Sequence, residues 1–206
     1  MPLTGTRAIT DALKHGDRKM AKEAEIGGGR GWSRWRAAAW GIAALIVLLP
    51  LVAMRFTAEV NWTASDFVFA GVLIGGTGLL FELAVRMSRH PAYRAGVGLA
   101  LAAIFLIIWA NGAVGMIGDE DNPYNLLFGG VILLALAGAI GAGFAAAGMA
   151  RAMLVAAIAQ VVVAAAGLSA DPRGAIFSAC FGGLWLLAAA AFWKAARDQA
   201  DAAPRA

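Results

Sequence analysis

The stretch NLLFGGVILLALAGAIGAGFAAA, residues 125–147, decides the fold because none of its 23 residues carries a charge. A helix rises about 1.5 Å per residue, so a stretch of this length crosses the hydrocarbon core of a bilayer, which is about 30 Å thick. Five further apolar stretches follow the same pattern, at residues 37–54, 66–86, 95–117, 150–168 and 175–196. The sequence therefore predicts an all-α integral membrane protein, a bundle of six transmembrane helices that forms one domain over residues 37–197.

The composition agrees with this class of protein, since 61% of the residues are hydrophobic and only 15% are charged. Soluble domains contain fewer apolar and more charged residues. The least distinct division lies between the fourth and fifth spans, where AGMAR, residues 147–151, contains a single charge, Arg151. An arrangement of five spans is the alternative to six.

The distribution of charge distinguishes between these arrangements, because basic residues near the ends of spans stay on the cytoplasmic side during insertion. With the N-terminus inside, fifteen of the 17 Lys and Arg residues lie in cytoplasmic segments. The outer joins then contain Arg55 and Arg173 together with six acidic residues. Five spans would place Lys194 and Arg197 outside. We therefore expect six spans, with the N-terminus and the C-terminus in the cytoplasm.

Residues 1–36 differ from the rest of the chain, since they are polar and carry the whole net charge of +4. We expect a basic cytoplasmic tail, flexible or amphipathic, and a second short cytoplasmic tail at residues 198–206. Trp rings favour the headgroup level of a bilayer, and Arg favours its anionic cytoplasmic leaflet. The end of the first tail therefore predicts an interfacial anchor made of Trp32, Arg34, Trp35 and Arg36. Anionic lipids are its expected partner, and nucleic acid is not.

An internal repeat is one interpretation of the sequence, because FGGVILLA at residues 128–135 aligns without a gap with FGGLWLLA at residues 181–188. A weaker copy, FAGVLI, occurs at residues 69–74. Three helical hairpins would account for this pattern. The alternative is a chance similarity, since apolar helices are built from few residue types. Small residues at helical spacing serve packing within a chain and between chains alike, so a homo-oligomer or another membrane protein is an expected partner.

Polar residues within spans are the candidates for function, because each is costly in hydrocarbon unless it is paired or faces water. Glu82 is the only carboxylate well inside a span, and Arg86 lies four residues later on the same helical face. Two interpretations stay open. The two residues form an ion pair at the interface, or Glu82 carries a proton or a cation.

Thr77, Asn111 and Gln160 are expected closer to the middle of the membrane, where they form a polar layer. If their helices meet, the hydroxyl and amide groups satisfy one another, each bond contributing about 0.6 kcal/mol. The alternative is that Asn111 and Gln160 line a path for a polar solute.

The join GDEDNPYN, residues 118–125, concentrates acidic residues in Asp119, Glu120 and Asp121. A divalent cation site is one interpretation, although calcium loops alternate their ligands and end on a bidentate Glu, which this join does not. The favoured interpretation is helix capping, in which Asp121 or Asn122 caps the fourth span and Pro123 starts it. Residues 65–66 and 171–172 are expected to cap the second and sixth spans in the same way.

Catalytic and cofactor motifs are not found in the sequence. His15 and His90 lie in cytoplasmic segments without nearby Cys residues or acid pairs, and Cys180 has no second cysteine for a disulfide. We expect no enzyme activity, no cofactor and no metal site.

Four short motifs stand out along the chain: EVNWT at residues 59–63, WANG at 109–112, EDNP at 120–123 and GMAR at 148–151. Together they resemble an uncharacterised family of small polytopic bacterial membrane proteins. The resemblance covers about two thirds of the chain, leaves out residues 1–36 and implies an inner-membrane location without an activity.

Two functions remain open from the sequence. The first is a non-enzymatic accessory or structural membrane component. The second is a small transporter or channel for protons, a cation or a neutral polar solute, which uses Glu82 and the polar layer.

Overall fold

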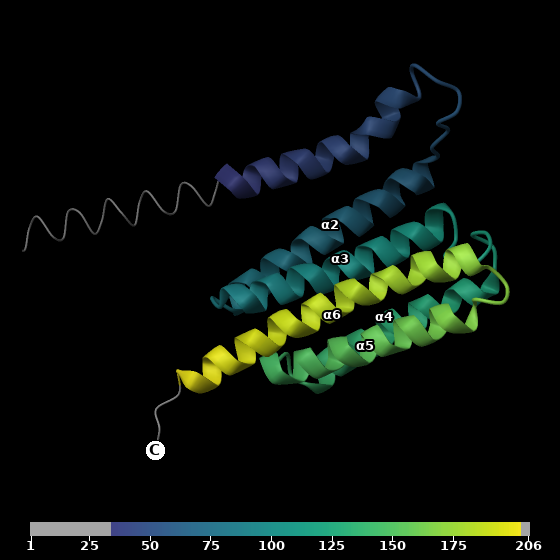
Figure 1. Cartoon of the computed structure of the whole chain (residues 1–206). Helices are drawn as coiled ribbons and strands as arrows, with labels where there is room; N and C mark the ends of the chain where they lie inside the picture. The colour runs from purple at the N-terminus through teal and green to yellow at the C-terminus, as the bar shows by residue number, and fades with distance from the viewer. Residues whose placement is uncertain (1–33, 203–206) are drawn as a thin grey trace, which may run out of the picture. The chain divides into compact units, whose positions relative to one another are not determined.

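The computed structural model describes residues 34–202, and all of its regular elements in that range are helices (Figure 1). Six of them are long and apolar enough to cross a membrane, which confirms the predicted all-α, multi-pass fold. Their bounds are Arg34–Ala53, α2 Ala64–Met87, α3 Pro91–Ala113, Pro123–Gly141, α5 Ala146–Ala166 and α6 Pro172–Asp201. The fourth of these spans consists of a short 3₁₀ helix η1, Pro123–Asn125, followed by α4, Leu126–Gly141. Trp32 of the predicted anchor lies outside the described residues.

The chain divides into two units, and the boundary between Gly71 and Val72 falls inside α2. In the first unit, the start of α2 is held by hydrogen bonds between Thr63 and Asp66. The Thr63 N–H donates to Asp66 Oδ2 over 2.7 Å, and the Thr63 hydroxyl donates to the same oxygen over 2.8 Å. Trp62 packs edge-on against Phe67, with ring centroids 5.2 Å apart. The cap was expected at residues 65–66, whereas α2 begins at Ala64, so that Asp66 lies in its first turn and binds back to Thr63.

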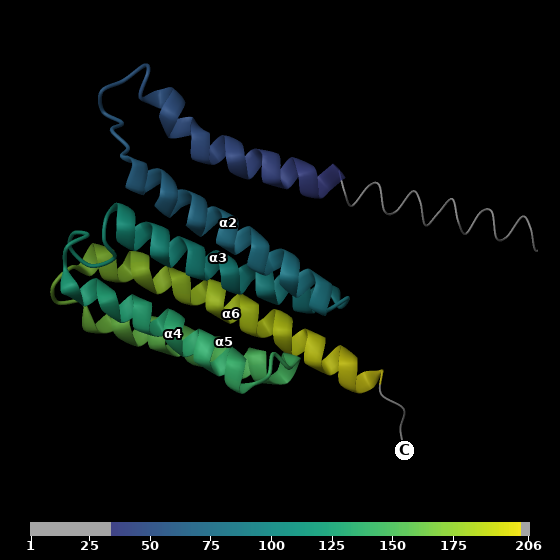
Figure 2. The same ribbon diagram turned by 180° about the vertical axis from the view of Figure 1, so that it is seen from behind.

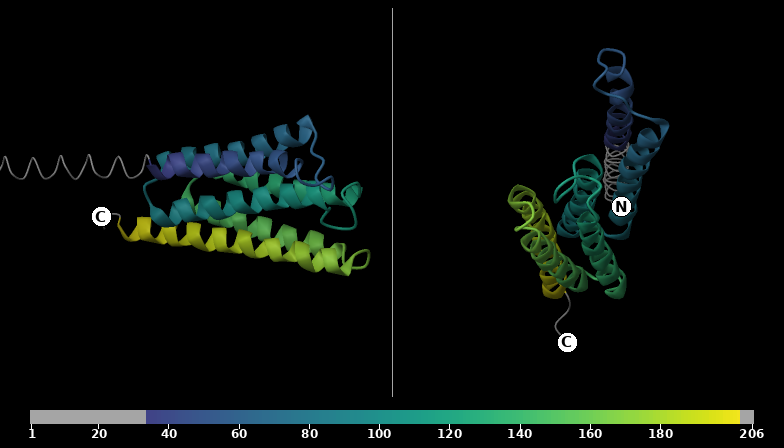
Figure 3. Two further views of the ribbon diagram at one scale, coloured as in Figure 1. Left: turned by 90° about the horizontal axis from the view of Figure 1, so that it is seen from above. Right: turned by 90° about the vertical axis from the view of Figure 1, so that its right-hand side faces the viewer.

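In the second unit, α3, α4, α5 and α6 form a bundle of antiparallel and parallel helices (Figures 1 and 2). The most extensive contact joins α5 to α6, while α6 also packs against α3, and α4 packs against α5. The view along the helices in Figure 3 shows these neighbours. The largest fully buried side chains include Trp185 and Phe192 of α6, Ile107 of α3 and Phe128 of α4. α6 is therefore the central helix of the unit.

Small residues allow the helices of this bundle to approach closely, as expected where no hydrophobic drive between helices exists. A Cβ at Gly96 would lie 3.0 Å from the Phe192 ring, and a Cβ at Gly138 would lie 2.7 Å from that of Ala152. Many of the remaining buried positions are alanines, such as Ala103, Ala156 and Ala188. Gly96 and Gly138 thus have a packing reason within the chain.

The two ends of this unit differ in charge. At one end α2 finishes, α3 starts, α4 meets α5 and α6 finishes; we call it the basic end, and it contains Arg86, Arg89, Arg94, Lys194 and Arg197. The opposite end contains Asp119, Glu120, Asp121 and Asp171, and we call it the acidic end.

Two spans end earlier than the sequence analysis placed them. α3 stops at Ala113 rather than at residue 117, since the chain turns at Gly115 and Gly118, whose φ angles are +76° and +73°. α4 stops at Gly141 rather than at residue 147, because Gly143 and Phe144 adopt φ angles of +54° and +59°. Left-handed residues of this kind end a helix.

The other spans differ in smaller ways. α3 starts at Pro91, α5 at Ala146 and α6 at Pro172, each a few residues before the predicted start, and α6 continues to Asp201. Arg151 consequently lies inside α5 rather than in the join before it. Phe128 is the third residue of α4, whereas Phe181 is the tenth of α6, so the two repeat motifs begin at different depths.

Candidate functional site

Glu82 and Arg86 form the ion pair that the sequence predicts. Arg86 Nη2 lies 3.5 Å from Glu82 Oε2, and the two side chains are 68% and 18% exposed. Both residues lie near the end of α2, which finishes at Met87. The mostly exposed Arg86 therefore lies at the basic end, and Glu82 lies one turn further into the span.

The three residues of the predicted polar layer each donate a hydrogen bond to a main-chain carbonyl. Thr77 Oγ1 donates to Leu73 over 2.7 Å, and Asn111 Nδ2 donates to Ile107 over 2.8 Å, both within their own helices. Gln160 Nε2 donates across to the Ser178 carbonyl of α6 over 3.0 Å. Only Gln160 thus joins two helices through its side chain.

Gln160 belongs to a buried polar chain near the acidic end. Its side chain and that of Ser178 are fully buried, and the Ser178 hydroxyl donates to the Met116 carbonyl over 3.1 Å. Met116 follows α3, so this chain of two bonds connects α5, α6 and the loop after α3. The sequence analysis missed Ser178, although a lone hydroxyl in an apolar span was a signal.

Asn125 organises the loop between α3 and α4. Its Oδ1 accepts from the N–H groups of Met116 and Ile117 over 3.1 and 2.9 Å, and its Nδ2 donates to the Asp119 carbonyl over 2.7 Å. The side chain is buried, with 8% of the residue exposed. The side-chain amide of Asn125 therefore forms hydrogen bonds with main-chain groups on both sides of the turn in the loop. This role was not predicted from the sequence.

The acidic join closes against the start of α6. Asp171 Oδ2 accepts from the Gly118 N–H over 3.0 Å, while its Oδ1 accepts from the Gly174 N–H over 2.9 Å. These bonds, first that from Gly174 and then that from Gly118, lower the pKa of Asp171 below its ordinary value of 3.8. Asp171 is thus both the predicted cap of α6 and a tether for the join.

The rest of the join serves capping as well. Asn122 Oδ1 accepts from the Tyr124 N–H over 3.0 Å, and Pro123 occupies the first position of η1, as predicted. Asp119, Glu120 and Asp121 are exposed. Among the residues that the structure describes, no group of three or more His, Cys, Asp or Glu side chains is placed to hold a metal ion.

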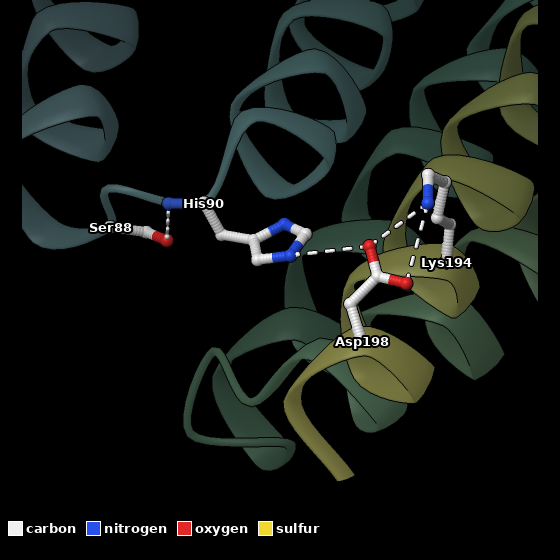
Figure 4. Close-up of polar contacts among 4 residues, drawn as sticks. All are labelled: Ser88, His90, Lys194 and Asp198. Carbon is white, nitrogen blue, oxygen red and sulfur yellow. Dashed lines mark hydrogen bonds and ion pairs between the residues drawn. The ribbon is translucent and has the colours of Figure 1, made fainter. Parts of the chain in front are cut away.

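The basic end contains a second polar cluster, which Figure 4 shows. His90 Nε2 lies 3.4 Å from Asp198 Oδ2, and Lys194 Nζ lies 2.9 Å from the same oxygen. His90 precedes α3 and Asp198 lies in the last turns of α6, so the cluster joins the ends of two helices. From the sequence, His90 was expected in a cytoplasmic segment without acidic neighbours, whereas in the structure it is partly buried and contacts Asp198 of α6.

Three further hydrogen bonds hold this end together. Arg94 of α3 reaches back to α2, where its Nε donates to the Ser88 carbonyl over 2.7 Å and its Nη2 to the Val85 carbonyl over 2.9 Å. Tyr93 donates through its hydroxyl to the Phe144 carbonyl over 2.9 Å. The turn between α4 and α5 is therefore attached to the start of α3.

Known proteins add no assignment to this geometry. No protein family, no curated protein and no solved structure matches the sequence. The resemblance to an uncharacterised bacterial family stays a prediction.

Proposed function

We propose that this protein is a non-enzymatic accessory or structural component of the bacterial inner membrane, with both termini in the cytoplasm. The observation that carries the proposal is the use of the polar groups in the second unit. Ser178 and Asn125 are buried and bind main-chain groups of the loop after α3, and Gln160 binds α6. These contacts support a role for the polar residues in fixing helices and loops.

Glycines without a packing reason within the chain support an assembly partner. A Cβ at Gly129 or Gly130 of α4 would meet no atom within 4 Å. Glycine in a helix costs about 1 kcal/mol relative to alanine, and packing within the described part of the second unit does not account for this pair. Close approach by a helix of a second copy or of another membrane protein does.

The proposed test compares flux and assembly in the same preparations. Purified protein in proteoliposomes is expected to conduct protons and small solutes no faster than empty liposomes. Glu82→Gln and Asn111→Leu are expected to leave this background unchanged and to alter only folding or the yield of crosslinked complexes. A proton or solute flux that depends on Glu82 would contradict the proposal.

The proposed orientation places the basic end in the cytoplasm, because that end contains most of the basic residues of the joins. Labelling with a membrane-impermeant maleimide tests it in a Cys180→Ala background. Glu120→Cys is expected to react in intact cells, and Arg89→Cys is expected to react only after lysis. The reverse pattern would place both termini outside.

The position of the described anchor residues supports contact with anionic lipids. Trp35 is 78% exposed, and Arg34 and Arg36 lie beside it in the first turn of the Arg34–Ala53 helix. Arginine near an anionic leaflet contributes about 1 kcal/mol per residue.

Transport of a neutral polar solute is the second candidate, and one observation favours it. Asn111 Oδ1 and Gln160 Oε1 are buried and accept no hydrogen bond from the part of the chain that the structure describes. Carbonyl oxygens of this kind are suited to a solute that donates hydrogen bonds. Solute efflux from proteoliposomes that Gln160→Met abolishes, with the fold intact, would establish this function in place of the first.

A further inference from the structure

A groove lies on the surface of the second unit where α4 turns into α5. Its volume is about 640 Å³, which lies within the range of about 300–1,000 Å³ typical of small-molecule sites. α4 contributes Leu134, Gly138 and Gly141 to its wall, and α5 contributes Arg151, Ala152 and Val155. All of these except Arg151 are small or apolar.

Small residues create the groove. Gly138 meets Ala152, and Gly148 meets Ala142, so the two helices lie almost backbone to backbone along its floor. A Cβ at Gly141 would meet no atom within 4 Å, which shows that the wall beside the floor is open. The groove therefore has room for an occupant along α4.

One end of the groove is electropositive. Arg151 is exposed, and its Nε donates over 3.3 Å to the Ala147 carbonyl of its own helix. Within the described residues, Arg151 forms no ion pair with a carboxylate. The start of α5 adds to this charge, because Ala145 provides no side-chain cap and no acidic residue lies in the first turn.

The other end of the groove is apolar. Val155 lies one turn beyond Arg151 on the same face of α5, and Leu134 lies two turns before Gly141 on α4. The groove therefore runs from the end of the bundle toward the middle of the span. A cation at the headgroup level followed by an apolar channel is complementary to a phosphate that carries an acyl chain.

We propose that this groove binds one anionic phospholipid, with its phosphate at Arg151 and the start of α5 and an acyl chain between Gly141 and Leu134. Charge complementarity selects this occupant. A second copy of the chain would have to place an acidic group opposite Arg151. Within the second unit the acidic residues of the joins lie at the acidic end, while Glu82 and Asp198 at the basic end are paired with Arg86 and Lys194, which leaves Asp201 at the end of α6 for such a contact. The site consists of residues of α4, α5 and the turn between them, and it does not depend on the proposed accessory function.

The test measures lipid adducts of the full-length purified protein by native mass spectrometry, during titration with phosphatidylglycerol or phosphatidylcholine. The first phosphatidylglycerol is expected to bind more tightly than the first phosphatidylcholine. Arg151→Gln is expected to weaken phosphatidylglycerol binding about fivefold, the equivalent of about 1 kcal/mol, and to remove this preference. Arg151→Lys, which keeps the charge, is expected to retain most of the preference.

A second pair of variants tests the acyl-chain part of the groove. Gly141→Leu fills the open wall without a clash and is expected to weaken the first binding event for both lipids. Gly183→Leu is the matched control, since its Cβ also meets no atom within 4 Å and it lies on α6, outside the groove. It is expected to bind both lipids as the unaltered protein does.

Three results would overturn the proposal. Equal binding of the two lipids, or no change with Arg151→Gln, would remove the anionic headgroup from the site. Displacement of the lipid by an equal concentration of glycerol 3-phosphate would assign the site to a free phosphate compound. A dimer that Gly141→Leu dissociates, with lipid adducts unchanged, would assign the groove to a second copy of the chain.

Discussion

At the scale of single residues, Ser178 and Gln160 are both fully buried but differ in what they satisfy. The Ser178 hydroxyl donates a hydrogen bond to the Met116 carbonyl, which lies in a loop. The Gln160 amide donates to a carbonyl inside α6, and its own Oε1 accepts no hydrogen bond from the described part of the chain. A buried polar group that loses its partner costs about 1–3 kcal/mol.

Ser178→Ala is therefore expected to destabilise the protein by about 1 kcal/mol, because it leaves the buried Met116 carbonyl without its side-chain donor. Gln160→Met is expected to change the stability by no more than about 0.6 kcal/mol, since it also removes the unsatisfied oxygen. Thermal unfolding in detergent, followed by tryptophan fluorescence, measures both. A larger loss for Gln160→Met than for Ser178→Ala would contradict this account.

The lowered pKa of Asp171 predicts that the stability of the fold depends on pH. Its pKa in the folded protein is lowered below 3.8 by hydrogen bonds from Gly174 and Gly118, so the carboxylate stabilises the fold above the unfolded pKa. This contribution is expected to be complete at neutral pH and to be lost as the pH falls below 3.8 through the folded pKa. The variant Asp171→Asn lacks this titration.

The midpoint of thermal unfolding is expected to be lower for Asp171→Asn than for the unaltered protein at neutral pH. The gap between them is expected to narrow in acid. Asp121→Asn is the control, because Asp121 is exposed at the same end of the second unit. A gap that stays constant from neutral pH to below pH 3.8 would contradict the role of the charge.

At the scale of elements, the turn between α4 and α5 stores strain at one residue. Phe144 adopts a φ of +59°, a conformation that costs an L residue about 1–2 kcal/mol, while the neighbouring Gly143 adopts +54° at little cost. The Tyr93 hydroxyl binds the Phe144 carbonyl and holds the turn in place.

Opposite effects are expected from substitutions at these neighbours. Gly143→Ala is expected to destabilise the protein by about 1 kcal/mol through its backbone alone, since a Cβ there meets no atom within 4 Å. Phe144→Gly is expected to be neutral or stabilising. The same thermal unfolding assay distinguishes them, and a destabilised Phe144→Gly would show that its ring, which is 46% exposed, packs against lipid or a partner.

The starts of helices were easier to predict from the sequence than their ends. Asn122, Pro123 and Asp171 signal the starts of η1 and α6 by local chemistry that operates without tertiary contacts. The ends of α3 and α4 depend on positive φ angles at Gly115 and Phe144, within stretches whose hydropathy continues unchanged. An apolar composition therefore indicates a span but not where its backbone turns.

At the scale of the whole molecule, the glycines of α4 that have free space beside them predict an interface with another helix. Gly129→Leu and Gly130→Leu are expected to abolish crosslinked oligomers or complexes without a change in the monomer's thermal stability, since a side chain at either position meets no atom within 4 Å. Gly183→Leu on α6 is the comparison, since a Cβ there is equally open; loss of crosslinking in this variant alone would place the interface on α6 instead. Unaltered crosslinking in both α4 variants would contradict an interface at this face.

The membrane-spanning fold could be predicted from the apolar stretches alone, because in hydrocarbon the backbone N–H and C=O groups must bond to one another, as they do in a helix. The contacts of the candidate site could not be predicted from the apolar stretches. The Glu82–Arg86 pair was visible at helical spacing, but Ser178, Met116 and Asn125 meet only after the chain has folded, and a lone Ser or Asn gives no signal of its partner. Long-range polar contacts of this kind lie beyond what the periodicity of a single sequence specifies.

The central position of α6 has a consequence for the synthesis of the protein. Arg94 ties α2 to α3 as soon as the hairpin has left the ribosome, because its partners Val85 and Ser88 precede it closely in the chain. Trp185, Phe192 and Asp198 reach the membrane only after α3, α4 and α5 have been inserted. A chain that stalls before α6 therefore leaves exposed the faces of α3 and α5 that α6 would cover.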